Sequence, residues 1–135
     1  MIKLVLFDLD NTLYPTYRQV RKCREKAVKA MIKRGLKGSE REISGELETI
    51  IRELGSNSQR HFDELVKRIA GDYDLSIISA GITAYNITKQ KLMKPYKDVR
   101  KTLRKLSILT NGEPKKQWDK INRLDLYRYF RKRSH

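Results

Sequence analysis

The first element that the pattern of apolar and polar residues predicts is a strand at the start of the chain. Residues 2–7 form a short run rich in apolar, strand-forming side chains, and polar residues follow at once. Nearly continuous hydrophobicity is typical of a strand buried on both faces in a parallel sheet. Asp8–Thr12 is therefore predicted to be a loop at the carboxyl end of this strand. Pro15 closes the segment because it biases Tyr14 away from helix.

From residue 16 to residue 94, apolar residues recur every three or four positions, which is the period of an amphipathic helix. Gly35, Gly55, Gly71 and Pro95 are the predicted stops, and Ser39-Glu40-Arg41-Glu42 has the spacing of a capping box. Short connections between four such helices predict a small helical bundle. The four apolar stripes are Val20, Cys23, Ala27 and Met31; Ile43, Leu47, Ile51 and Leu54; Phe62, Leu65, Val66 and Ile69, in a helix that Ser56-Asn57-Ser58-Gln59 starts; and Ile78, Ile82, Tyr85 and Leu92.

After residue 95 the pattern is that of an α/β protein. Val99, Leu103 and Leu106 indicate a helix, residues 107–110 a strand, and residues 111–112 a turn, before Pro114 begins another helix. The predicted organisation is an α/β domain formed by residues 1–15 and 95–135, with residues 16–94 inserted as a helical domain. Two strands alone do not form a stable parallel sheet, because both faces and both edges of such a sheet need cover, so the α/β core is predicted to be incomplete.

The net charge of the chain indicates which classes of binding partner to consider. The chain has 31 Lys plus Arg against 16 Asp plus Glu, a net charge of +15, and most of the excess follows residue 75. Such a balance favours polyanions, but no zinc-finger spacing, aromatic RNA-binding motif or compact helix-turn-helix is present, so nucleic-acid binding is not expected. No apolar run is long enough to cross a bilayer, and Cys23 is alone, which excludes a disulfide framework. We expect a cytoplasmic protein without a membrane partner; its oligomeric state is not predicted.

The sharpest chemical feature is the pair Asp8 and Asp10, two residues apart where open α/β sheets bind ligands. The first carboxylate can attack phosphorus while sharing Mg²⁺ with the substrate, and the second can protonate the leaving oxygen and then take a proton from water. Two solvated aspartates after an edge strand are the plain alternative. An EF-hand loop is excluded because Leu13 and Gln19 stand where Gly and Glu are required.

These residues also carry a family resemblance. Phe7–Leu13 resembles the first signature of the haloacid dehalogenase (HAD) superfamily, DxDx(T/V), and residues 108–112 resemble the second, an apolar strand that ends in Thr or Ser. The helices between them are similar to the cap that many members insert there, and the resemblance, closest to archaeal-type phosphatases, covers essentially residues 1–130. It implies a partial Rossmann-like HAD core, made of the first strand plus one further βα unit, with an inserted four-helix cap.

The resemblance also implies roles for individual residues. Asp8 is the nucleophile that becomes an aspartyl-phosphate and a ligand of Mg²⁺, and Asp10 is the general acid/base, with its backbone carbonyl on the metal. Thr110 binds a phosphoryl oxygen, aided by the backbone N–H groups of Asn111 and Leu9. The implied reaction is the Mg²⁺-dependent hydrolysis of a small phosphate ester, because the true dehalogenases lack the second carboxylate.

Two further family signatures, a Lys and an acidic pair, follow the second signature in relatives. Only 25 residues follow Thr110 here, and they contain no acidic pair. Asp72 and Asp74 imitate the acidic pair but precede the second signature, so Gly71–Asp74 is predicted to be a helix-stop turn. We therefore expect a C-terminally truncated hydrolase with impaired or no activity. The alternatives are a non-catalytic basic binding module and a degenerate fragment.

Overall fold

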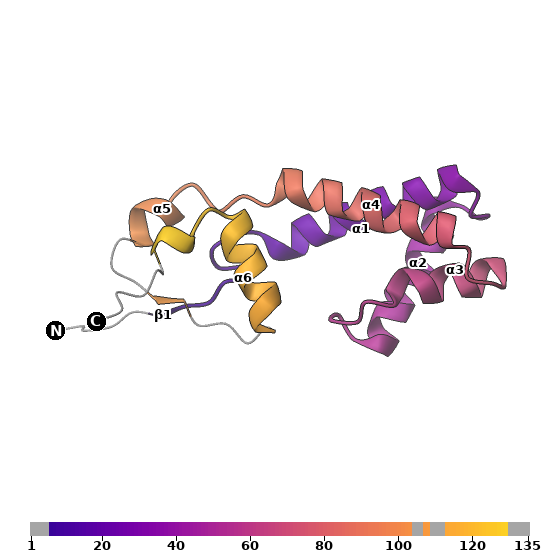
Figure 1. Cartoon of the computed structure of the whole chain (residues 1–135), viewed down its shortest axis with the longest axis horizontal. Helices are drawn as coiled ribbons and strands as arrows, with labels where there is room; N and C mark the ends of the chain where they lie inside the picture. Colours follow the sequence, from indigo (N-terminus) through magenta and orange to yellow (C-terminus); the bar gives the residue numbers. More distant parts are fainter. Residues whose placement is uncertain (1–5, 104–106, 109–112, 130–135) are drawn as a thin grey trace. The chain divides into compact units, whose positions relative to one another are not determined.

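The computed structural model describes residues 6–103, 107–108 and 113–129 (Figure 1). Helices predominate, and the two strands are short. In chain order the elements are β1 Leu6–Phe7, α1 Thr16–Arg34, α2 Glu40–Leu54, α3 His61–Ala70, α4 Leu75–Leu92, α5 Val99–Thr102, β2 Ser107–Ile108, α6 Pro114–Arg123 and the 3₁₀ turn η2 Tyr127–Tyr129.

The chain divides into two compact units. One consists of Met1–Gln19 together with Gln90–His135, and the other is Val20–Lys89. The first holds both strands with α5 and α6, and the second holds α2, α3 and most of α1 and α4. The domain boundaries at residues 15/16 and 94/95 stay a prediction.

The α/β unit is built on a parallel pair of strands. Leu6 of β1 lies opposite Ser107 of β2, and Phe7 lies opposite Ile108. The prediction that the first strand is buried on both faces is wrong for its described part, because Leu6 is 50% exposed. Side chains alternate between the faces of a strand, and Phe7 is the one that packs on the core of this unit. That core is formed by Leu9, Leu13, Tyr14, Met93, Val99, Leu103, Ile121, Leu124 and Leu126.

The helical unit has a core of its own, to which all four of its helices contribute. The capping box is present: the Ser39 side chain accepts a bond from the Glu42 N–H, and the Glu42 carboxylate accepts one from the Ser39 N–H. Gly71 ends α3 in the left-handed conformation, and the Asp74 carboxylate accepts bonds from the first turn of α4, so the helix-stop turn is confirmed. The buried core residues are Val28, Met31, Leu36, Ile43, Leu47, Ile50, Leu65, Val66, Ile77 and Ile78.

The start of α3 differs from the prediction. The segment Ser56–Gln59 was expected to begin a helix, but α3 begins at His61, and its N-cap residue, Arg60, makes no side-chain capping bond. Gly55 is the C-cap residue of α2 and has a φ of 79°. The Ser58 N–H donates a hydrogen bond to its carbonyl. The residues directly after Gly55 therefore form a turn, and α3 begins only after this turn.

The buried stripe of α4 agrees with the predicted one at Ile78 but not at Ile82. Ile77, Ile78 and Gly81 are buried, whereas Ile82, which the apolar pattern placed in the core, is 42% exposed. The reason is the close approach of α4 to α1 within the helical unit. A Cβ atom built on Gly81 would lie 2.6 Å from Met31 Cε and 3.0 Å from its Cγ and Sδ atoms, so a larger residue there would require the Met31 side chain to shift.

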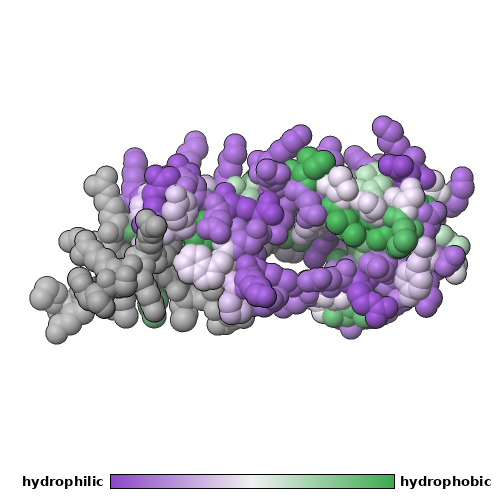
Figure 2. Space-filling model, viewed as in Figure 1, coloured by the Kyte–Doolittle hydropathy of each residue, from purple (hydrophilic) through white to green (hydrophobic). Residues whose placement is uncertain are grey.

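This placement of the buried stripe leaves apolar side chains of α4 on the surface, including Leu75, Ile82 and Ile87. Figure 2 shows apolar side chains gathered over the segment that Figure 1 labels α4. Despite this apolar character, no helix in the part of the chain that the structure describes combines the length and hydropathy that a bilayer span requires.

Candidate functional site

The loop after β1 is a tight turn anchored by a buried leucine. Leu9 is fully buried in the core of the α/β unit, and its carbonyl accepts a bond of 3.0 Å from the Leu13 N–H. Asn11 has a φ of 58°, in the left-handed region that Asn tolerates better than most residues. Because Leu9 points into the core between them, the neighbouring aspartates are presented away from it.

Asp8 comes directly after β1 and is exposed. Among the described residues, no side chain donates a hydrogen bond to its carboxylate. A carboxylate without such partners keeps its lone pairs available, which is what a nucleophile or a metal ligand needs.

Asp10 is held from several sides within the α/β unit. Its Oδ1 atom accepts bonds from the Tyr14 hydroxyl at 2.8 Å and the Thr16 hydroxyl at 3.0 Å. The Lys120 ammonium, from α6, lies 2.7 Å from Oδ1 and 3.0 Å from Oδ2. Burial acts to raise the pKa of Asp10, but the bonds from Lys120, Tyr14 and Thr16 and the Lys120 charge outweigh it, so that the pKa is lowered. Asp10 is therefore an oriented, ionised carboxylate.

The same loop also caps the first turn of α1. The Asn11 side chain accepts a bond of 2.9 Å from the Tyr17 N–H, and the Thr16 hydroxyl accepts one of 3.1 Å from the Asn11 N–H. The first N–H groups of a helix have no partner within the helix, so the bond to Asn11 satisfies the Tyr17 N–H, which would otherwise need water. Residues 10–17 thus form one hydrogen-bonded segment.

The structure thus describes three of the five predicted site residues, namely Asp8, Leu9 and Asp10, in one turn. Thr110 and Asn111 lie outside the described residues, and their roles stay predictions, as do those of the other three. Sequence reasoning missed the three partners of Asp10. The Tyr14 contact, at four residues, was within reach of local reasoning, but no local signal marks Lys120, which is 110 residues away in the chain.

A magnesium ion was predicted on Asp8 and Asp10. Among the residues that the structure describes, no group of three or more His, Cys, Asp or Glu side chains could hold a metal, and the Asp10 carboxylate is already paired with Lys120. The exposed Asp8 carboxylate and the backbone carbonyl of Asp10 are nonetheless hard oxygen donors, of the kind that bind Mg²⁺. Mg²⁺ is commonly held by one or two carboxylates together with waters and substrate phosphate. The donors present thus fit an ion shared with a phosphate better than a dedicated cage.

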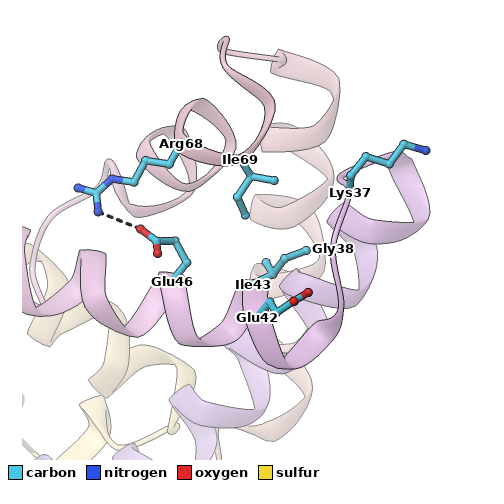
Figure 3. Close-up of a pocket in the computed structure, with 7 residues that line it drawn as sticks. All are labelled: Lys37, Gly38, Glu42, Ile43, Glu46, Arg68 and Ile69. Carbon is cyan, nitrogen blue, oxygen red and sulfur yellow. Dashed lines mark hydrogen bonds and ion pairs between the residues drawn. The ribbon is translucent and has the colours of Figure 1, made fainter.

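A cavity of about 360 Å³ lies in the helical unit (Figure 3). Its walls include Lys37 and Arg68, but the Arg68 guanidinium already donates to three carboxylates, on Glu46 and Glu53 of α2 and on Glu64 of α3. Figure 3 shows the bond to Glu46 across one side of the cavity. The cation of Arg68 is therefore engaged in holding α2 and α3 together.

Comparison with known proteins decides the family. A family model described as "haloacid dehalogenase-like hydrolase" matches residues 2–134. The chain belongs to the haloacid dehalogenase-like hydrolase family. It is 42% identical over 139 residues to a glyceraldehyde 3-phosphate phosphatase of Methanopyrus kandleri and 43% identical over 137 residues to one of Methanocaldococcus jannaschii. Each alignment covers 96% of this chain and 60% of the relative, so the chain spans about 60% of the length of these family members.

Solved structures of other proteins share the fold. A Thermotoga maritima protein assigned as a beta-phosphoglucomutase has a TM-score of 0.62 at 18% identity, with 96% of this chain and 59% of that chain covered. HAD-hydrolase YfnB of Bacillus subtilis, in a magnesium-bound structure, has a TM-score of 0.52 at 16% identity, with 93% and 60% covered. The predicted fold class, a partial α/β HAD core with a helical cap, is confirmed.

Proposed function

We propose that the protein is a phosphohydrolase that acts on a small phosphate ester of the glyceraldehyde 3-phosphate type through an aspartyl-phosphate on Asp8. The observation that supports this proposal most strongly is the arrangement of the two aspartates after β1. Asp8 is exposed and without a side-chain partner among the described residues, whereas Asp10 is fixed by three side chains. Two identical carboxylates in different environments are suited to different tasks. Members of the family 38–43% identical to this chain are named glyceraldehyde 3-phosphate phosphatases.

The proposed reaction has two steps. The reaction starts from the minor population in which the Asp10 carboxyl carries a proton, since this carboxyl is otherwise ionised. An Asp8 oxygen forms a bond to phosphorus as the ester P–O bond breaks, and the leaving oxygen takes that proton from Asp10. Water then attacks phosphorus, gives a proton to the Asp10 carboxylate and breaks the bond between Asp8 and phosphorus. Asp8 is thereby returned unchanged, Asp10 is protonated again, and the products are an alcohol and phosphate.

Magnesium is the cofactor in this proposal. Asp8 would supply a carboxylate oxygen and Asp10 its backbone carbonyl, and the ion, when bound, would neutralise charge on the phosphoryl group. The carboxylate of Asp10 is not proposed as a metal ligand because its negative charge is already paired with the Lys120 ammonium.

The test is metal-dependent release of phosphate from glyceraldehyde 3-phosphate by the 135-residue chain. Because the chain spans about 60% of its relatives, the protein is used in excess over the ester, so that a single turnover is measured. We expect slow release with Mg²⁺, since the sequence predicts an impaired enzyme, and none with a chelator or with Asp8→Asn. Asp72→Asn, which changes an exposed aspartate of the helical unit, is the matched control and should keep the activity. Release that is unaffected by Asp8→Asn would refute the proposal, as would its complete absence in the unmodified chain.

A further inference from the structure

Lys120 joins two parts of the α/β unit that are distant in the sequence. It lies on α6, and its ammonium bridges both oxygens of Asp10, in the loop after β1. The lysine side chain is 18% exposed and the aspartate side chain 33%. Most of the other ion pairs of described residues join side chains of greater exposure, and several of them lie only three or four positions apart in the sequence. Among these pairs it is the one best shielded from solvent, and its partners are too far apart in the sequence for it to result from helix spacing.

The contacts of the two carboxylate oxygens are unequal. Oδ1 accepts bonds from Tyr14, Thr16 and Lys120, which exhausts its capacity as an acceptor. Within the part of the chain that the structure describes, Oδ2 accepts from Lys120 alone. One oxygen is thus anchored, and the other has a lone pair left for a ligand. An exposed carboxylate without these bonds would rotate about its side-chain torsions and present either oxygen.

We propose that Lys120 is a positioning residue for Asp10, which holds the carboxylate with Oδ1 anchored and Oδ2 directed to the reacting groups. This inference rests on the proposed function, because it assigns Lys120 to the same reaction. Lys120 itself exchanges no proton and forms no bond with the substrate. Its effect is on the orientation of Asp10, and a misplacement of about 1 Å in such a group costs about 100-fold in rate.

The kinetic test compares Lys120→Met with Lys120→Arg in the full 135-residue chain. Met keeps the apolar stem and removes the charge, whereas Arg keeps the charge and two or more donors. We expect Lys120→Met to lower the single-turnover rate at saturating glyceraldehyde 3-phosphate at least 10-fold, with half-saturation changed less than 2-fold. Lys120→Arg should recover most of the rate. Lys101→Met, on the exposed face of α5 in the same unit, should match the unmodified chain.

A second measurement reads the ion pair directly. An ammonium fixed on a carboxylate exchanges its protons slowly enough to give a side-chain ¹⁵N signal in lysine-labelled protein. We expect one such signal that disappears in both Lys120→Met and Asp10→Asn while circular dichroism shows both variants folded.

The outcomes separate the two proposals. If the unmodified chain cleaves the ester and Lys120→Met cleaves it equally fast, or if Lys120→Arg is as slow as Lys120→Met, the positioning role is refuted and the proposed function stands. Absence of the paired ammonium signal also refutes the role. If the unmodified chain does not cleave the ester, the proposed function fails and the positioning role fails with it.

Discussion

The close contact between α1 and α4 predicts opposite effects for two glycine substitutions. Gly81 and Gly45 both lie inside helices, α4 and α2, and replacing either with Ala gives the same gain in helix propensity, about 1 kcal/mol. Around Gly45, apart from its chain neighbours and the nearby backbone of its own helix, no atom lies within 4 Å of the added Cβ. At Gly81 the Cβ would lie 2.6 Å from Met31 Cε and 3.0 Å from Cγ and Sδ, and Met31 is fully buried, so its side chain has little room to move.

The expected change in unfolding free energy follows from the cost of overpacking and the gain in helix propensity. Overpacking a close-packed site costs about 1–3 kcal/mol, so after the propensity gain of about 1 kcal/mol, Gly81→Ala should destabilise the helical unit by about 0–2 kcal/mol. Gly45→Ala should stabilise it by about 1 kcal/mol. The difference between the two variants, about 1–3 kcal/mol, is the quantity that isolates the steric contact, because backbone entropy and propensity are common to both.

The assay is urea unfolding followed by helical circular dichroism, with the unmodified chain, Gly45→Ala and Gly81→Ala measured side by side. Comparable slopes of unfolding free energy against urea would show that the variants unfold from equally compact states. If Gly81→Ala stabilised the protein as much as Gly45→Ala does, the close packing of α4 against Met31 would be refuted.

Other predictions concern the same unit. Ser39→Ala should cost about 1 kcal/mol in urea unfolding because it removes the capping box. The bonds from Ser39 lower the pKa of Glu42, so the contribution of Glu42 to stability is complete above its unfolded pKa and is lost as the pH falls through its folded pKa. Urea unfolding measured across that acid range should therefore show that Ser39→Ala costs less stability as the pH falls. A cost that does not change with pH would contradict the assignment of the capping box. Ile82→Lys should change the unfolding free energy by less than about 0.5 kcal/mol, whereas Ile78→Lys should destabilise by several kcal/mol because it buries a charge. Equal changes in unfolding free energy for these two variants would support the apolar stripe of α4 that the sequence predicts, in which Ile82 is buried, and contradict the observed one.

Some helix boundaries were predictable because they depend on residues that are close in the sequence. The capping box at Ser39 and the stop at Gly71 depend on residues within four positions, and both are present in the structure. The stripe of α4 was predicted correctly at Ile78 but wrongly at Ile82, because a periodicity argument counts apolar side chains. Gly81 contributes no side chain, yet it marks the line along which α4 approaches α1 most closely.

The candidate site was predictable to the same limited extent. Asp8 and Asp10 were found because a strand pattern and two carboxylates are adjacent in the sequence. Lys120 was not found because it is one of 31 basic residues and its partner is 110 positions away. Only the pairing of β1 with β2, and the helix that follows β2, bring the two together, and that information is in the tertiary structure.

The three carboxylates around Arg68 have a consequence for how this unit can change during evolution. Any one of Glu46, Glu53 and Glu64 can be lost while the arginine still has two partners, so single losses should be tolerated. Loss of Arg68 first leaves three like charges facing one another between α2 and α3, which repel. The order of substitution is therefore constrained: the glutamates can disappear one by one, but the arginine can be replaced without penalty only after them.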